Sequence, residues 1–123
     1  MDRPYTYDAK LIDVVDGDTL DLDFDLGMNL HVHTRVRLYG VDTPETFGVK
    51  KDSEEYKKGK EAAAFVCMVL GDLADHPRLV VQTRKDKKGK YGRYLAEVFV
   101  QVSEQWISLN DLLVEEGHAK PIE

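Results

Sequence analysis

The sequence predicts an α+β fold that is mainly β, with a five-stranded barrel and two or three helices. The first third of the chain alternates apolar and polar residues with a period of two, which is typical of strands with one buried face. A helical pattern then separates this part from two further strand patterns. A chain of 123 residues fits one domain, so we expect residues 1–123 to form a single domain.

The first three strands are predicted at residues 8–15, 19–26 and 30–41. The first ends at the turn Asp16-Gly17-Asp18, where glycine and aspartate favour a change of direction. The second and third alternate strictly, and a turn at 27–29 joins them. We therefore expect a meander whose apolar face is buried and whose charged face meets water.

The remaining elements follow after a polar loop at 42–53. A helix is predicted over 54–70, with Gly71 at its end, and strands are predicted at 79–85 and 94–102. A second helix over 109–116 follows Ser108, a favourable N-cap residue. Five strands, with one helix after the third and another after the fifth, form the pattern of an OB-type barrel.

Charge is distributed unevenly along the chain. The net charge of -6 argues against holding nucleic acid by bulk electrostatics. Residues 84–93, however, contain six basic residues and only one acidic residue, whereas residues 13–25 contain six aspartates and no lysine or arginine. The two segments suggest a bound cation that meets a polyanion, and the alternative is that both are solvated surfaces.

The sequence also carries expectations about compartment and association. No apolar run is long enough to span a membrane, and the first ten residues lack an apolar signal core, so we expect a cytoplasmic or a processed secreted protein. We expect a monomer with no membrane partner. Cys67 is the only cysteine and falls in an apolar helical pattern, so we expect a buried thiol. Trp106 is expected to pack in the core.

Three short motifs carry residues suited to phosphodiester hydrolysis, which needs an activated water and positive charge around the phosphate. They are Asp-Gly-Asp-Thr at 16–19, Arg-Leu-Tyr-Gly-Val-Asp-Thr-Pro-Glu at 37–45 and Lys-Tyr-Gly-Arg at 90–93. The first two offer oxygen ligands of the kind calcium takes, and the third offers an arginine that fits a phosphate. Taken singly, the first is also an ordinary turn and the second an ordinary strand exit.

In this order, and followed by Leu-Ala-Glu-Val-Phe-Val, the motifs resemble the staphylococcal nuclease, or thermonuclease, family. The resemblance runs from about residue 8 to about residue 120. It implies a calcium-dependent nuclease, with Ca²⁺ as cofactor, that hydrolyses DNA, RNA or both by metal-assisted attack of water. The alternative is a non-catalytic SNase-like module that binds nucleic acid or peptides.

The resemblance also implies a role for each matching residue. The carboxylates of Asp18 and Asp42 and the carbonyl of Thr43 would be calcium ligands. Glu45 would act as general base on a water or orient that water, and these two roles stay open. The phosphate would be held by two arginines, Arg37 and Arg93. Three further residues would support the metal site or contact substrate, namely Asp16, Lys90 and Tyr91.

Some features depart from the family pattern or stand outside it. Gly89 stands where the family's best-known member has an aspartate, and the sequence ends at Glu123, before the family's third helix and the tyrosines that precede it. We therefore expect weaker and more salt-sensitive nucleic-acid binding. His31 and His33 form a His-x-His pair that can bind zinc on a strand, but no third ligand is evident and a polar surface is the expectation.

Overall fold

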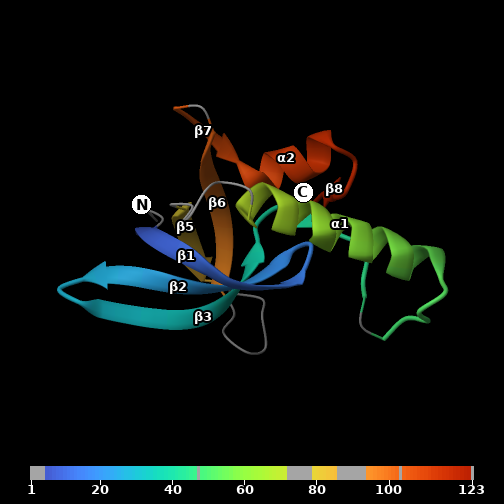
Figure 1. The fold of residues 1–123 in the computed structure, drawn as a ribbon, viewed down its shortest axis with the longest axis horizontal. Coiled ribbons are helices and arrows are strands. Elements are labelled where there is room, and N and C mark those ends of the chain that lie inside the picture. Colours follow the sequence, from blue (N-terminus) through green and yellow to red (C-terminus); the bar gives the residue numbers. More distant parts are fainter. Residues whose placement is uncertain (1–4, 47, 72–78, 86–93, 103, 123) are drawn as a thin grey trace.

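The structure is a computed structural model that describes residues 5–46, 48–71, 79–85, 94–102 and 104–122. Strands β1 (Tyr5–Asp16), β2 (Thr19–Gly27) and β3 (Leu30–Leu38) form the expected antiparallel meander (Figure 1). β1 begins three residues earlier than predicted. Its first residues pair with another strand of the barrel rather than with β2.

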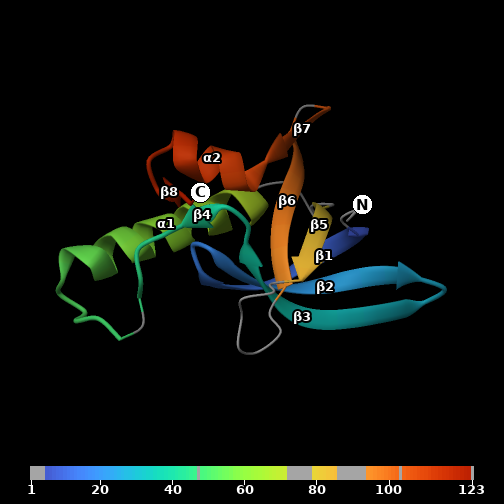
Figure 2. The same ribbon diagram turned by 180° about the vertical axis from the view of Figure 1, so that it is seen from behind.

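The barrel closes through β5 (Leu79–Lys85) and β6 (Tyr94–Val102). β1 pairs antiparallel with β5, and β5 pairs antiparallel with β6. The beginning of β6 then pairs in parallel with the end of β3, and this pairing closes the sheet into a barrel (Figures 1 and 2). The predicted mainly β, α+β fold with a closed five-stranded OB-type barrel is confirmed.

Two helices and three short strands complete the described part of the chain. Helix α1 (Glu54–Gly71) has the predicted extent to within one residue, and α2 (Leu109–Glu115) begins after Ser108, whose hydroxyl accepts the Asp111 N–H at 3.3 Å. The prediction that the third strand runs to residue 41 is wrong, because β3 ends at Leu38 and Gly40, with a φ of 76°, turns the chain. The short strands were not predicted as separate elements, and they are β4 (Val41–Asp42), β7 (Gln105–Ser108) and β8 (Lys120–Pro121). Among the described residues, no helix combines the length and apolarity needed to cross a membrane.

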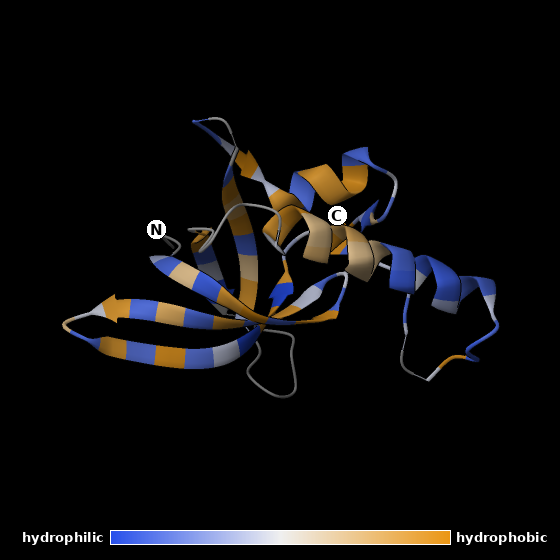
Figure 3. Cartoon of the chain, viewed as in Figure 1, coloured by the Kyte–Doolittle hydropathy of each residue, from blue (hydrophilic) through white to orange (hydrophobic). Residues whose placement is uncertain are grey.

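The core lies inside the barrel and under the two helices. The alternation of apolar and polar residues along the strands is visible in Figure 3, as is the change along α1 from a polar first half to an apolar second half. Both helices contribute side chains with no exposed surface, and so do three barrel strands: Leu20, Leu22, Leu79, Val81, Val98, Val100, Val66, Leu70, Leu109 and Leu113. Burial of this apolar surface is the main stabilising contribution to such a fold.

The β2–β3 hairpin extends beyond the barrel as an arm, defined here as residues 21–35 (Figure 1). Its tip is a two-residue turn in which Met28 and Asn29 have φ angles of 53° and 63°, so the predicted turn at 27–29 is confirmed. The prediction that the apolar face is buried along its whole length is wrong near the tip. Leu26, Leu30 and Val32 remain 43–55% exposed because the arm extends past the elements that cover the barrel.

Two further expectations are wrong. Cys67 is exposed, because the buried stripe of α1 runs through Gly59, Ala62, Val66 and Leu70, and residue 67 falls beside that stripe. Trp106 is 45% exposed because β7 is a short edge strand, paired only with the end of β6.

Candidate active site

Asp18 lies in the turn between β1 and β2 and is only 6% exposed. Its Oδ1 accepts the Thr19 hydroxyl at 3.1 Å, and its Oδ2 accepts the Thr43 backbone N–H at 3.2 Å. Its backbone carbonyl accepts the Leu38 N–H at 2.8 Å. These bonds hold the carboxylate between the first turn and the chain that leaves β3. They bring the first two sequence motifs together.

Arg37 faces two of the predicted calcium ligands. It lies on β3 opposite Thr19. Its Nη2 is 3.2 Å from Asp42 Oδ1 and 3.9 Å from Asp18 Oδ2. One guanidinium therefore stands between a buried carboxylate and an exposed one. A guanidinium so placed also has donors that suit phosphate oxygens.

Two more predicted residues, Thr43 and Asp16, lie close to Asp18 and Arg37. Thr43 is 3% exposed, and its Oγ1 has no hydrogen-bond partner among the described residues, which is unusual for a buried hydroxyl. Asp16 is 7% exposed and accepts a hydrogen bond from the Thr46 hydroxyl. The Asp16–Thr46 bond ties the β1–β2 turn to the loop that carries Glu45.

Two glycines let the backbone of this loop pack closely on its neighbours. A Cβ at Gly59 of α1 would lie 2.6 Å from the Pro44 carbonyl oxygen and 3.1 Å from that of Glu45. A Cβ at Gly17 would lie 2.8 Å from Cβ of Ala62, also on α1. Helix α1 therefore fixes the position of the turn and the loop by direct contact.

Glu45 lies at the junction of two open clefts. One has a volume of about 700 Å³ and also contains Asp16, Asp18 and Arg37, and the other has a volume of about 420 Å³ and also contains Asp42. Partial loss of water raises the pKa of the Glu45 carboxyl above its ordinary value. The negative charges of Asp18, Asp16 and Asp42 raise it further, and Arg37 opposes them.

The oxygen donors fit a calcium ion. Asp18 and Asp42 offer carboxylates beside one guanidinium, and Thr43 adds backbone oxygen and an unpartnered hydroxyl. Calcium accepts such a mixture, with waters completing a flexible shell. Within the part of the chain that the structure describes, no three histidine, cysteine, aspartate or glutamate side chains are grouped to hold a metal by themselves. Backbone oxygen and water would therefore have to supply part of the coordination.

Three of the predicted site residues lie outside the described residues, and two other residues were not singled out from the sequence. Lys90, Tyr91 and Arg93 belong to the first group. Arg35 was missed, although it lines the same cleft as Arg37 and lies two residues before it on the same strand face. Asn110 was also missed. It is a buried amide whose Oδ1 accepts the Val98 N–H and whose Nδ2 donates to the carbonyls of Tyr39 and Ala96.

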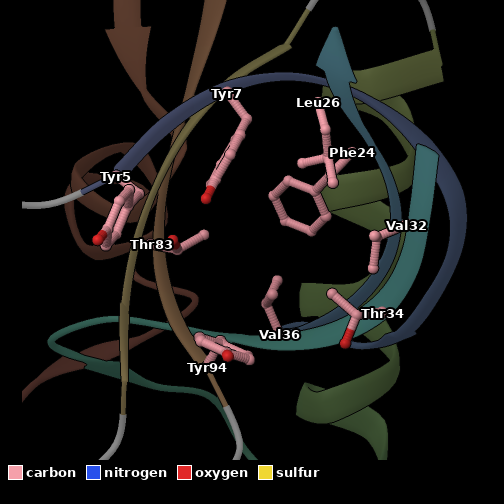
Figure 4. A pocket seen from close by; sticks show the side chains of 9 residues that line it. All are labelled: Tyr5, Tyr7, Phe24, Leu26, Val32, Thr34, Val36, Thr83 and Tyr94. Carbon is pink, nitrogen blue, oxygen red and sulfur yellow. The ribbon is translucent and has the colours of Figure 1, made fainter. Parts of the chain in front are cut away.

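A second kind of cavity opens at the mouth of the barrel. It has a volume of about 280 Å³ and is lined mainly by apolar and aromatic side chains, including Tyr7, Phe24 and Tyr94 (Figure 4). The Tyr7 and Phe24 rings meet edge to face, with centroids 5.6 Å apart. None of the described residues that line this cavity is charged, so the acidic cleft beside Arg37 is the better candidate for catalysis.

Comparison with known proteins bears on the family of the chain. Residues 35–123, which include Arg37, Asp42, Thr43 and Glu45, match the family model described as staphylococcal nuclease homologue. The chain belongs to this family. The resemblance predicted from the three motifs is thus confirmed. Asp18 lies before the matched range, and the structure adds it to the group through its contacts with Thr43 and Arg37.

Relatives of the staphylococcal nuclease homologue family match over most of the chain. An uncharacterized protein of Methanocaldococcus jannaschii is 31% identical over 98% of this chain and 61% of its own length. Thermonucleases of Staphylococcus hyicus and Staphylococcus intermedius are 34% and 40% identical, over 90% and 71% of this chain and 57% and 45% of their own lengths. The chain therefore spans about half of the length of these relatives. They support a nuclease-type family.

Proposed function

We propose that this chain is a calcium-dependent nuclease that hydrolyses phosphodiester bonds in DNA, RNA or both by attack of water. The observation that carries the proposal is the position of the Arg37 guanidinium, 3.2 Å from Asp42 and 3.9 Å from Asp18. A partly exposed arginine held by two carboxylates at an open cleft supports the binding of a phosphate beside a cation. The names of the thermonuclease relatives point to the same activity.

The proposed reaction assigns distinct tasks to Arg37 and Glu45. Arg37 donates hydrogen bonds to the nonbridging oxygens of the scissile phosphate and stabilises the charge that grows there. The Glu45 carboxylate takes a proton from the attacking water or orients that water through a hydrogen bond. Its raised pKa makes it a better proton acceptor than an ordinary glutamate, which favours either task.

Asp18, Asp42 and Thr43 would hold the calcium ion. Calcium supplies positive charge next to the phosphate and lowers the pKa of a water that it binds. Asp18 is kept in place by hydrogen bonds from Thr19 and Thr43. Asp16 keeps the adjoining loop in register through Thr46. These supporting bonds matter because small displacements of reacting groups cost large factors in rate.

Substrate binding would rely on local rather than overall charge. The chain has a net charge of -6, so attraction to a polyanion must come from cations near the cleft. Arg35 and Arg37 line that cleft. Lys90 and Arg93 are proposed to add phosphate contacts, and Tyr91 to contact the neighbouring nucleotide. Affinity should therefore fall as salt rises.

The proposal is tested by incubating supercoiled plasmid and single-stranded RNA with the chain in calcium, in magnesium and in chelator. We expect cleavage with calcium and none with chelator. The variant Glu45→Ser should reduce the rate by about 10³-fold or more while its circular dichroism spectrum stays unchanged. Nucleic-acid binding with no cleavage in any metal would instead favour the non-catalytic module. Near-normal cleavage by Glu45→Ser would overturn the role given to that residue.

A further inference from the structure

The cavity at the mouth of the barrel is small and opens to solvent. Phe24, Val36 and Thr83 are buried and form its floor, whereas Tyr5 and Tyr94 are exposed at its edge (Figure 4). Its volume of about 280 Å³ lies just below the range of about 300–1,000 Å³ that is typical of pockets for drug-sized molecules. The cavity therefore fits one small group better than a large ligand.

Aromatic rings surround this space on several sides. Tyr5 and Tyr7 are two residues apart on β1, and their rings lie nearly parallel, with centroids 6.4 Å apart and planes inclined by 16°. Tyr94 lies across the opening from Tyr7, and the Phe24 ring lies between them (Figure 4). Aromatic faces bind nucleic-acid bases by stacking, and they accept any base because every base has a π face. The cavity is therefore suited to a planar aromatic ligand.

The polar side-chain atoms of the cavity are hydroxyl oxygens. They come from three tyrosines and two threonines, namely Tyr5, Tyr7, Tyr94, Thr34 and Thr83. A hydroxyl donates or accepts a hydrogen bond, so it suits either kind of group on the edge of a base. None of the described residues that line the cavity is charged, which favours a neutral group over a phosphate. The base is the neutral, planar part of a nucleotide.

The cavity adjoins the cleft that contains Arg37, and Val36 lines both. On β3, the arginines at 35 and 37 alternate with Thr34 and Val36, so the two sets leave opposite faces of the strand. The printed pairing of β3 with β6 begins at Val36, so among the described residues the edge of β3 before Val36 has no neighbouring strand. This open edge separates the cavity from the cleft.

We propose that the cavity binds an unpaired base of a single-stranded nucleic acid whose phosphates lie in the cleft beside Arg37. The proposal rests on the proposed nuclease function and adds a preference for single strands to it. The base stacks against the tyrosine rings, and the backbone crosses the open edge of β3 toward Arg35 and Arg37. A base within a duplex is already paired and stacked, so it enters the cavity only at the cost of unpairing.

The test is the fluorescence anisotropy of a short labelled oligothymidine titrated with the full chain in chelator, so that no calcium-dependent cleavage occurs. Tyr5→Leu and Tyr94→Leu each remove a ring and keep an apolar side chain. Each should weaken binding at least about fivefold, as expected for the loss of stacking on one base. The matched control is Trp106→Leu, because Trp106 is 45% exposed and Tyr94 43%, and Trp106 lies outside the cavity. This variant should bind as the parent does.

A second probe separates binding of bases from binding of phosphates. A strand of the same length without bases should bind the parent at least about fivefold more weakly than the oligothymidine, and Tyr94→Leu should reduce this difference. Equal binding of the two strands by the parent, or unchanged oligothymidine binding by both tyrosine variants, would overturn the proposal. Absence of calcium-dependent cleavage with this binding pattern intact would overturn the nuclease function alone. Circular dichroism of each variant checks that the fold is retained.

Discussion

Two neighbouring positions on one face of β3, Arg37 and Arg35, carry similar charge pairs in different surroundings. Arg37 lies between Asp42 and Asp18, and Asp18 is almost fully buried. On the arm, Arg35 lies 2.8 Å from Asp21 in a pair that is largely open to water. Exposed pairs of this kind contribute little to stability.

The carboxylates of Asp18 and Asp21 differ in the groups that hold them in place. Two hydrogen-bond donors within the protein fix Asp18, one of them a backbone N–H from a segment distant in sequence. Asp21 has the Arg35 side chain as its partner. A buried carboxylate with fixed orientation can present its remaining lone pairs to a cation, whereas an exposed pair chiefly neutralises itself. We infer that burial, rather than the pairing of charges, distinguishes the proposed catalytic group around Arg37 from the Arg35–Asp21 pair.

The largest effect is expected when the two arginines are exchanged for lysine one at a time. Arg37→Lys should reduce calcium-dependent cleavage by about 10³-fold, because an ammonium cannot form the bidentate contact with phosphate. Arg35→Lys, two residues away on the same strand face, should change the rate by less than about tenfold. Initial rates on plasmid DNA provide the measurement. Equal losses of cleavage rate in both variants would contradict the difference proposed between Arg37 and Arg35.

A smaller effect is expected from Gly59→Ala, which tests the packing that holds the cleft. The new methyl group would press on the Pro44 carbonyl oxygen, so the loop with Glu45 must shift. We expect a loss of about 1–3 kcal/mol in the free energy of unfolding, as for other overpacked sites, and a lower kcat. Urea denaturation and steady-state kinetics measure the two quantities.

Gly71→Ala is the control for this substitution, because it lies in the same helix and a Cβ there would meet no atom of the described residues within 4 Å. Stability should be unchanged or slightly higher, since alanine favours helix more than glycine does. A normal kcat for Gly59→Ala together with normal stability would show that α1 does not fix the Glu45 loop.

The smallest effect is expected from Asp21→Asn on the arm. The hydrogen bond from Arg35 lowers the pKa of the Asp21 carboxyl in the folded chain. A lowered pKa stabilises the fold at pH values above the ordinary value and ceases to do so as pH falls through the folded value. The parent should therefore exceed Asp21→Asn slightly in stability at pH 7, and the gap should close at strongly acidic pH. A gap that widens in acid would contradict this sign.

Much of the fold followed from local patterns. The strands 79–85 and 94–102 and the start of the second helix after Ser108 were predicted with the bounds observed, because runs of apolar strand-forming residues and an N-cap residue are local signals. The pairing of β4 with β8 was not predicted, since it joins residues 41–42 to residues 120–121. The exposure of Leu26 and Val32 was missed because the alternation of apolar and polar residues shows which face of a strand is apolar. It does not show how far along the strand other elements cover that face.

The motifs singled out candidate site residues but not the contacts between them. Asp18, Arg37 and Asp42 were found through the motifs, and the structure brings them together as the motifs require. Thr46 and Asn110 were missed, because each acts through hydrogen bonds to residues far away in the sequence. Asn110 did leave a signal, since it is an amide on the buried side of an apolar helix pattern.

The most direct test of the account is the rate of plasmid cleavage as a function of calcium concentration for three proteins. They are the parent chain, Asp42→Asn at the cleft and Asp23→Asn on the arm. The account predicts saturable, calcium-dependent cleavage by the parent and by Asp23→Asn, and a shift of at least about tenfold to higher calcium for Asp42→Asn. Cleavage that does not depend on calcium, or an unchanged calcium requirement in Asp42→Asn, would contradict it.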